Sequence, residues 1–312
     1  MTTDTQPALT TRRLGVKRRR AGETLIRWVL FACALLSVGT TIAIIFALLG
    51  PTIEFFGKVS FREFFTTNVW APLFSPAHFG VAPLIVGTLV TTAWAIVVCI
   101  PCGLGTAIYL SEYASPRRRA ALKPIIELLA GIPTVVYGFF ALTYVTPLLR
   151  NLWFGGDPPS VFNALSAGLV MGVMILPTVA SMSEDAMSAV PQSLRAGAYA
   201  LGGSKLQVST RVVVPAALSG IVASFVLAIS RAVGETMIVL IAAGGTPALT
   251  LDPREAMQTM TSFIAAAGIG DQSTGSIGYK TLFAVGSTLF LATFVMNAFS
   301  IRLVRRFREV YE

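Results

Sequence analysis

Residues Ser219–Ala243 read SGIVASFVLAISRAVGETMIVLIAA, and only Arg231 and Glu235 carry a charge in this stretch. A helix needs about 20 mostly apolar residues to cross the hydrocarbon core of a bilayer. The stretch is long and apolar enough for that, and Arg231 stands at its middle. It therefore predicts a membrane-spanning helix with two ionisable side chains at membrane depth.

Five further segments of the chain have the same apolar character. They are Leu25–Leu49, Ala82–Leu110, Ile125–Leu148, Ala164–Met182 and Thr281–Leu303. The composition agrees, because 12% of the 312 residues are charged, against about 25% in soluble domains. The sequence predicts an all-α integral membrane protein with six transmembrane helices.

The distribution of basic residues predicts the orientation of these helices. Alternation places the N-terminal tail, the loops 111–124 and 183–218 and the C-terminal tail on one side. These parts, with Arg27, hold 18 of the 24 Lys and Arg residues. By the positive-inside rule both termini are predicted to be cytoplasmic, in a multi-pass protein of the cell membrane.

A block of basic residues precedes the first apolar segment directly. It consists of Arg12, Arg13, Lys17, Arg18, Arg19 and Arg20. Such a block is typical of an orientation signal that also contacts anionic membrane lipid. We expect no nucleic-acid partner, although the formal net charge is +9.

Arg231 and Glu235 are the two charged residues deep in a predicted span. Their i,i+4 spacing would place them on one face of a continuous helix, where they can pair. One interpretation is a buried ion pair that holds helices in register. The other is a substrate path, because a guanidinium donates two hydrogen bonds to an oxyanion and a nearby carboxylate would keep the ion from binding too tightly to leave.

The loop 183–218 contains the stretch PQSLRAGAYALGGSK at 191–205. Good helix formers with an apolar face begin it, and Gly202 and Gly203 are typical of a helix C-terminus. The loop is therefore predicted to present a short helix to a cytoplasmic partner.

This loop resembles the hallmark loop of the permease subunits of ABC importers. Ala198, Gly202 and Pro215 occupy matching positions. Val212 and Val214 stand in place of the usual Ile and Leu, and Ala196 and Gly197 in place of the usual Glu and first Ala. In that family the loop forms the coupling helix that docks on the ATPase. The resemblance implies the type I ABC importer permease fold, and it implies an ATPase-coupling role for four residues. These are Ala198, Gly202, Lys205 and Pro215.

The resemblance extends from about residue 84 to residue 303. It is sharpest at Gly87–Thr92, Tyr109–Tyr113, Leu128–Gly138, Arg231–Met237 and Gln258–Thr261. These stretches look like the phosphate-specific permeases, and more like the PstC type than the PstA type. The resemblance implies a heterodimer with a second permease subunit of the PstA type, an ATPase dimer and an external phosphate-binding protein. It also implies that Arg231 and Glu235 matter for phosphate passage. A permease for another oxyanion, such as molybdate or sulfate, is the alternative.

The sequence argues against several other functions. It contains no phosphate-binding loop, since Gly202-Gly203-Ser204-Lys205 lacks the required spacing. ATP hydrolysis is therefore expected of a separate subunit, and this chain is not expected to be an enzyme. One His and three scattered Cys residues indicate no metal site, and no cofactor is expected.

The apolar segments also suggest a division of the chain. We expect a basic cytoplasmic tail at 1–24, the first transmembrane helix with an external segment at 25–83, the permease domain at 84–303 and a cytoplasmic tail at 304–312.

Overall fold

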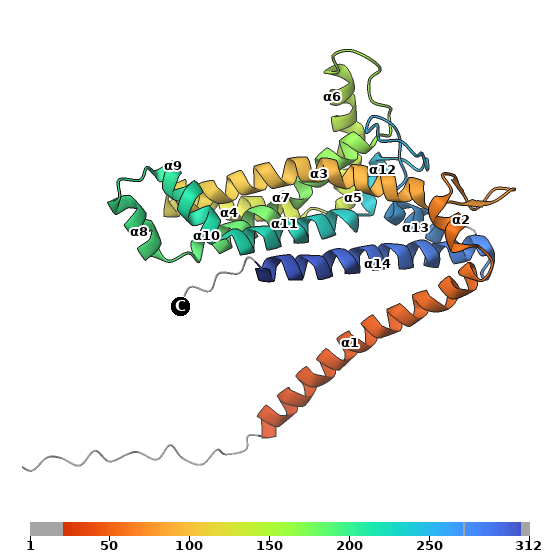
Figure 1. The fold of residues 1–312 in the computed structure, drawn as a ribbon, viewed down its shortest axis with the longest axis horizontal. Helices are drawn as coiled ribbons and strands as arrows, with labels where there is room; N and C mark the ends of the chain where they lie inside the picture. Colours follow the sequence, from red (N-terminus) through yellow and green to blue (C-terminus); the bar gives the residue numbers. More distant parts are fainter. Residues whose placement is uncertain (1–20, 271, 307–312) are drawn as a thin grey trace, which may run out of the picture. The chain divides into compact units, whose positions relative to one another are not determined.

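The computed structural model describes residues 21–270 and 272–306. It divides into two compact units, one ending at Ala47 and the other beginning at Leu48 (Figure 1). The basic block at 12–20 lies outside the described residues, as do residues 307–312 of the C-terminal tail.

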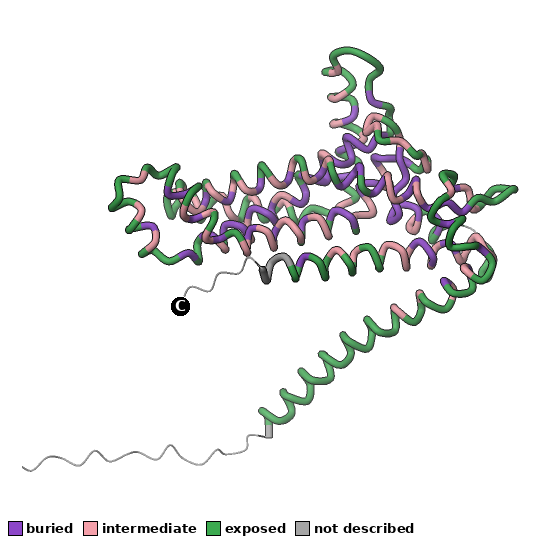
Figure 2. Tube along the Cα trace, in the orientation of Figure 1, coloured by how far each residue is buried: buried purple, intermediate pink, exposed green. Residues whose placement is uncertain are grey.

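Helix α1, Ala21–Phe56, contains the first predicted span. No residue of its most hydrophobic window is buried within the chain, and Figure 2 shows this helix exposed along most of its length. A helix that is apolar on all sides needs a nonpolar environment around it. The prediction of a spanning helix here is confirmed by length and hydropathy.

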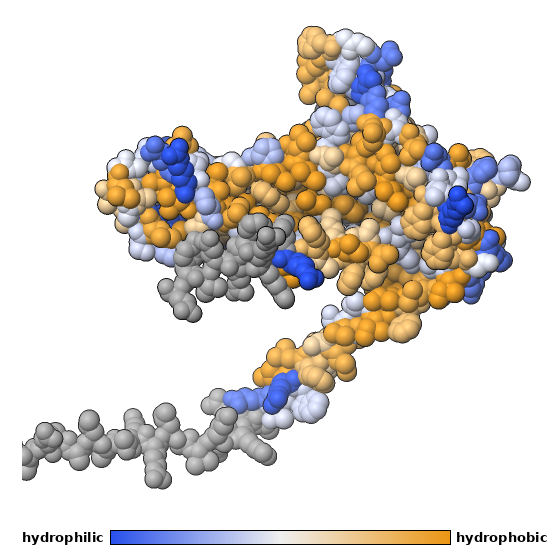
Figure 3. Space-filling view, viewed as in Figure 1, coloured by the Kyte–Doolittle hydropathy of each residue, from blue (hydrophilic) through white to orange (hydrophobic). Residues whose placement is uncertain are grey.

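Four long helices form the frame of the second unit. They are α3 (Ala82–Ile108), α7 (Ala164–Ser188), α11 (Leu218–Val233) and α14 (Ile277–Arg306). Along this series each helix packs on the next, α3 on α7, α7 on α11 and α11 on α14 (Figure 1). Figure 3 shows hydrophobic residues over the middle of these helices, with hydrophilic residues gathered toward the ends.

Small residues bring α3 and α7 into close contact. A Cβ added at Gly172 would lie 2.7 Å from the carbonyl oxygen of Ala95, and one at Gly168 would lie 2.9 Å from that of Thr91. Glycines at such positions allow two helix backbones to approach closely. The largest buried cluster, which includes Met171 and Met174, lies along this contact.

The third predicted span, Ile125–Leu148, is not one straight helix. It is divided among α4 (Pro116–Gly131), α5 (Thr134–Phe140), the π-helical segment η2 (Ala141–Val145) and α6 (Thr146–Asn151). The axes bend by 88° between α4 and the helical stretch that follows it. Pro133 interrupts the helix because it lacks a backbone N–H. The Tyr137 hydroxyl donates to the carbonyl of Leu129 at 2.8 Å across the break.

The fifth predicted span is also interrupted. Helix α11 ends at Val233, and α12 (Met237–Ala242) begins after three intervening residues. The prediction of one continuous helix over Ser219–Ala243 is therefore wrong. The described residues contain four helices that are long and apolar enough to span a membrane, and up to six spans if each of two bent helix pairs is one span.

The connections contain the shorter elements. They are α2 (Phe61–Thr66), β1 (Trp70–Ala71), β2 (His78–Phe79), η1 (Tyr109–Tyr113), α8 (Gln192–Ala200), α9 (Lys205–Val208), η3 (Ser209–Val213), α10 (Val214–Ala216) and α13 (Met260–Ile269). Strands β1 and β2 pair antiparallel, so the all-α prediction is corrected by one small hairpin. Aromatic side chains pack around this hairpin, with Trp70 and Phe263 in edge-to-face contact.

Candidate functional site

Arg231 lies in the last turn of α11 and its side chain is exposed on the surface of the chain. Its Nη1 donates to the Oγ1 of Thr178 in α7 at 3.2 Å. Among the described residues, Thr178 is the only side chain that forms a hydrogen bond with the Arg231 guanidinium. A guanidinium has five N–H donors, so most of this fork is available to another molecule.

Glu235 occupies the break between α11 and α12. Its Oε1 accepts hydrogen bonds from the backbone N–H groups of Met237 at 3.0 Å and Ile238 at 3.3 Å. The carboxylate therefore caps the first turn of α12, where unpaired N–H groups and the helix dipole favour a negative charge.

The two charged residues do not form the pair that their spacing predicts. Within residues 21–270 and 272–306, no ion pair within 4.0 Å joins Arg231 to Glu235, although six other ion pairs are present. The i,i+4 argument fails because the helix ends at Val233, between them. Glu235 caps the next helix, and the charge of Arg231 has no carboxylate partner in this part of the chain.

Three of the motif stretches meet beside this break. The hydroxyl of Thr261 donates to the backbone carbonyl of Glu235 at 2.6 Å. The N–H of Met260 donates to the hydroxyl of Thr88 in α3 at 3.0 Å. A Cβ at Gly87 would come within 2.4 Å of the carbonyl oxygen of Gln258, so this approach requires glycine. Motifs far apart in the sequence thus form one junction of α3, α12 and α13.

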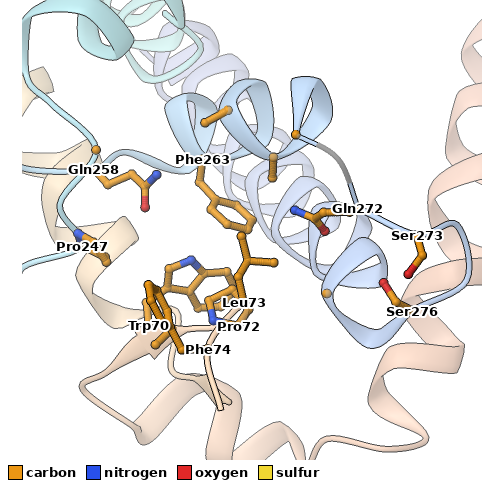
Figure 4. Close-up of a pocket in the computed structure, with 16 residues that line it drawn as sticks. Trp70, Pro72, Leu73, Phe74, Pro247, Gln258, Phe263, Gln272, Ser273 and Ser276 are labelled. Atoms are coloured by element: carbon orange, nitrogen blue, oxygen red, sulfur yellow. The ribbon is translucent and has the colours of Figure 1, made fainter. Parts of the chain in front are cut away.

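A pocket lies at the same end of the second unit as α13. It has a volume of about 560 Å³ and is lined by residues 70–74 of the β1–β2 hairpin, by Gly245, Pro247 and Gln258, and by several residues of α13, of the connection to α14 and of the start of α14, among them Phe263 and Gln272. Figure 4 shows the Trp70 and Phe263 rings forming one part of its wall, with the side chains of Gln258 and Gln272 on either side. Gln258 belongs to the motif stretch 258–261, so the pocket adjoins the junction.

The loop 183–218 forms its predicted short helix, α8. Gly202 has φ of +79°, a conformation that favours glycine. Its N–H donates to the carbonyl of Tyr199 at 2.9 Å, and the N–H of Gly203 donates to that of Ala198 at 3.1 Å. These bonds close the helix C-terminus. Leu201, at the tip, is 90% exposed, so the loop presents an apolar side chain outward.

The other two predicted coupling residues follow the turn. The ammonium group of Lys205, at the start of α9, lies 4.9 Å from the centre of the Tyr113 ring in η1. Pro215 is exposed in α10, directly before the 73° bend between Lys205–Ala216 and Leu218–Val233. Ala198, Gly202, Lys205 and Pro215 are thus spread over the loop rather than gathered at one point.

Sequence reasoning missed two ion-pair groups at this end of the second unit, each with a buried carboxylate. Arg195 of α8 pairs with Glu112 of η1 at 3.0 Å. Glu184, with a fully buried side chain, pairs with Arg119 and with Lys123, the latter at 2.7 Å. A usable signal was the i,i+4 spacing of Arg119 and Lys123, which places both on one face of α4.

These features define a class of protein: a multi-pass membrane component with an exposed helical loop at one end and a junction of broken helices toward the other. Residues 99–309 match the family described as "binding-protein-dependent transport system inner membrane component". The chain belongs to this family, which confirms the resemblance drawn from the motifs.

Several relatives that align with most of this chain are named as transport permeases. The chain is 36% identical to the "Probable ABC transporter permease protein YqgH" of Bacillus subtilis, over 89% of this chain and 90% of that protein. It is 33% identical to the "Phosphate transport system permease protein PstC 1" of Mycobacterium tuberculosis, over 92% and 96% of the two chains. It is 32% identical to PstC of Mesorhizobium japonicum, over 78% of each.

A solved structure supports the fold. The chain superposes with a TM-score of 0.64 on a chain of a bacterial alginate ABC transporter in complex with an alginate-pentasaccharide-bound periplasmic protein. The match covers 92% of this chain and 98% of the other, at 17% sequence identity. At this level of identity the match supports the ABC permease fold and carries no information about the substrate.

Proposed function

We propose that this chain is a membrane-spanning permease subunit of an ATP-driven ABC importer that translocates inorganic phosphate across the cell membrane. The observation that carries the proposal is the exposed guanidinium of Arg231, which has one hydroxyl partner and no carboxylate partner in the described chain. Relatives named as phosphate transport permeases over most of their length support the substrate.

Arg231 suits a tetrahedral oxyanion for physical reasons. The planar fork of a guanidinium can donate two parallel hydrogen bonds to phosphate oxygens. Because Glu235 is engaged by the backbone of α12, it leaves the charge of Arg231 available to the ion. Thr178 positions the guanidinium from the neighbouring helix α7.

The proposed assembly contains several partners. A second permease subunit of the PstA type would complete the path on the exposed side of Arg231. An ATPase dimer would dock on α8 and the segment through Pro215, and an external phosphate-binding protein would deliver the ion. We assign both termini to the cytoplasm, six spans to the chain and a permease domain to residues 84–303.

The proposal is tested by phosphate uptake in cells that lack their own high-affinity system and carry this chain with its partners. Wild type, Arg231→Ala and Arg231→Lys are compared at matched membrane levels of the complex. Loss of a charge-assisted interaction costs about 1.5–3 kcal/mol, so we expect Arg231→Ala to lower uptake at least about tenfold. Arg231→Lys keeps the charge without the fork and should give an intermediate rate.

Arg150→Ala is the matched control, because Arg150 is exposed and the described residues give its side chain no hydrogen bond or ion pair. Its uptake should equal that of wild type. Uptake of molybdate or sulfate in place of phosphate by wild type would replace the proposed substrate. Normal phosphate uptake by Arg231→Ala would remove Arg231 from the path.

A further inference from the structure

Arg195 of the coupling helix α8 is buried, although it lies in an exposed loop. The residue is 8% exposed. Its Nη1 donates to the carbonyl of Val190, and its Nη2 donates to the carbonyl of Met187 at 2.7 Å and to Oε1 of Glu112 at 3.0 Å. One side chain thus joins α8 to the end of α7 and to η1. It is turned inward and is not part of the surface that α8 presents.

The carboxylate partner is equally enclosed. The Glu112 side chain is 5% exposed, and its Oε1 also accepts a hydrogen bond from Ser111 at 2.9 Å. A pair this far from water holds its geometry, since separating the partners leaves an unpaired buried charge. It therefore differs from solvated surface ion pairs, which contribute little to stability.

The second half of the coupling loop contacts the same segment. Beyond the Gly202 turn, the ammonium of Lys205 lies 4.9 Å from the centre of the Tyr113 ring, a distance at which a cation attracts the face of an aromatic ring. Both halves of the loop therefore hold η1, the five-residue π-helical segment Tyr109–Tyr113. Single π-turns of this kind occur frequently at functional sites.

Helix α3 continues from η1 to the junction at the other end of the bundle. Its first turns contain Gly87 and Thr88, which contact Gln258 and Met260. The hydroxyl of Thr261, the residue after Met260, donates a hydrogen bond to the backbone carbonyl of Glu235. A displacement of η1 along α3 would therefore reach the broken segment that carries Glu235.

We propose that the Arg195–Glu112 pair is the link through which movement of the coupling helix α8 is transmitted to α3. Arg195 and Glu112 are positioning residues in this scheme and do not contact the transported ion. The inference rests on the proposed docking of an ATPase at α8, but not on which anion is transported.

The test uses the purified complex with its ATPase and needs no anion. Arg117 and Arg118 are exposed in the first turn of α4, shortly after η1, so tryptic cleavage at these residues reports on the segment that follows the end of α3. In wild type we expect the cleavage rate to change when the ATPase is trapped with ATP and vanadate. Glu112→Gln removes the negative charge but leaves the two hydrogen bonds from Arg195 to backbone carbonyls. The cleavage rate of this variant should no longer respond to the nucleotide.

Three further variants complete the test. Glu112→Asp retains the charge and should recover part of the response. Glu127→Gln, the same change at an exposed carboxylate of α4, should respond like wild type. Tyr113→Leu removes the ring below Lys205 at a position that is 40% exposed, so the chain should still fold and the response should be reduced.

A role in stability alone would lower the amount of complex without changing the response of the complex that forms. The inference is wrong if Glu112→Gln responds like wild type, or if wild type shows no nucleotide-dependent change. If Glu112→Gln does not assemble, an unchanged response in Tyr113→Leu would overturn the inference. The cleavage assay contains no transported anion. If wild type fails to take up phosphate in cells, that result would therefore count against the proposed substrate and not against the Arg195–Glu112 link.

Discussion

The contact of α3 with α7 and the break between α11 and α12 are built on different principles. Gly168 and Gly172 let two unbroken helices approach so closely that a Cβ at either position would lie within 2.9 Å of a carbonyl oxygen of α3. At the break, Glu235 and Thr261 supply hydrogen bonds to backbone groups that the interrupted helix leaves unpaired. Shape complementarity holds the first region, and side-chain hydrogen bonds hold the second.

This difference has a consequence for function. A close-packed contact has one arrangement, because interiors at native density transmit strain rather than absorb it. A break closed by a few hydrogen bonds can exchange partners at lower cost. The charged residues proposed for the ion path lie at the second kind of region, which suits a path that must open and close.

The largest expected effect is on the close-packed contact. Gly172→Ala places a Cβ 2.7 Å from a backbone carbonyl oxygen of α3, and overpacking of this kind costs about 1–3 kcal/mol. We expect a lower midpoint of thermal unfolding in detergent. Gly105→Ala is the control, because a Cβ there meets no atom within 4 Å. Equal midpoints for the two variants would mean that glycine spacing does not hold α3 to α7.

A smaller effect is expected at the break. Glu235→Ala removes the acceptor for two backbone N–H groups of α12, and loss of a helix cap costs about 0.5–2 kcal/mol. Glu235→Gln retains an acceptor oxygen, so it should unfold closer to wild type. The thermal midpoints of the three proteins measure this order. If Glu235→Gln is as unstable as Glu235→Ala, the negative charge matters more than the cap geometry.

The smallest effect is expected in the loop that joins the two regions. Hydrogen bonds from Arg254 and its positive charge hold the pKa of the Asp252 carboxyl below its usual value. Such a group adds stability above its unfolded pKa and loses it as the pH falls through the folded pKa. The pair is partly exposed, so water screens it.

We therefore expect wild type to have a higher free energy of unfolding than Asp252→Asn at about pH 5. This difference should shrink as the pH falls to about 3. Denaturant unfolding across this range measures it. The neighbouring backbone bonds from Leu165 to Pro253 and from Ala164 to Glu255 attach this loop to the start of α7. An advantage that stays constant with pH would show that Asp252 acts without its charge.

Sequence reasoning located most of the chain's helices but misjudged their continuity. The segments at Ala82–Leu110 and Ala164–Met182 became α3 and α7, and α7 extends to Ser188. Continuous apolar character predicts burial or lipid contact along a segment. It does not predict a break, which depends on whether neighbours such as Thr261 can bond the freed backbone groups.

The sequence by itself determined the membrane class, the positions of the apolar segments, the short helix in the loop 183–218 and the family. Each follows from local composition or from motif spacing, which are properties of short stretches. Only the tertiary structure decided that Glu235 caps α12 instead of pairing with Arg231, and that Arg195 is buried against Glu112. The physical reason is that a partner distant in sequence, such as η1 for α8, becomes a neighbour only when the helices pack.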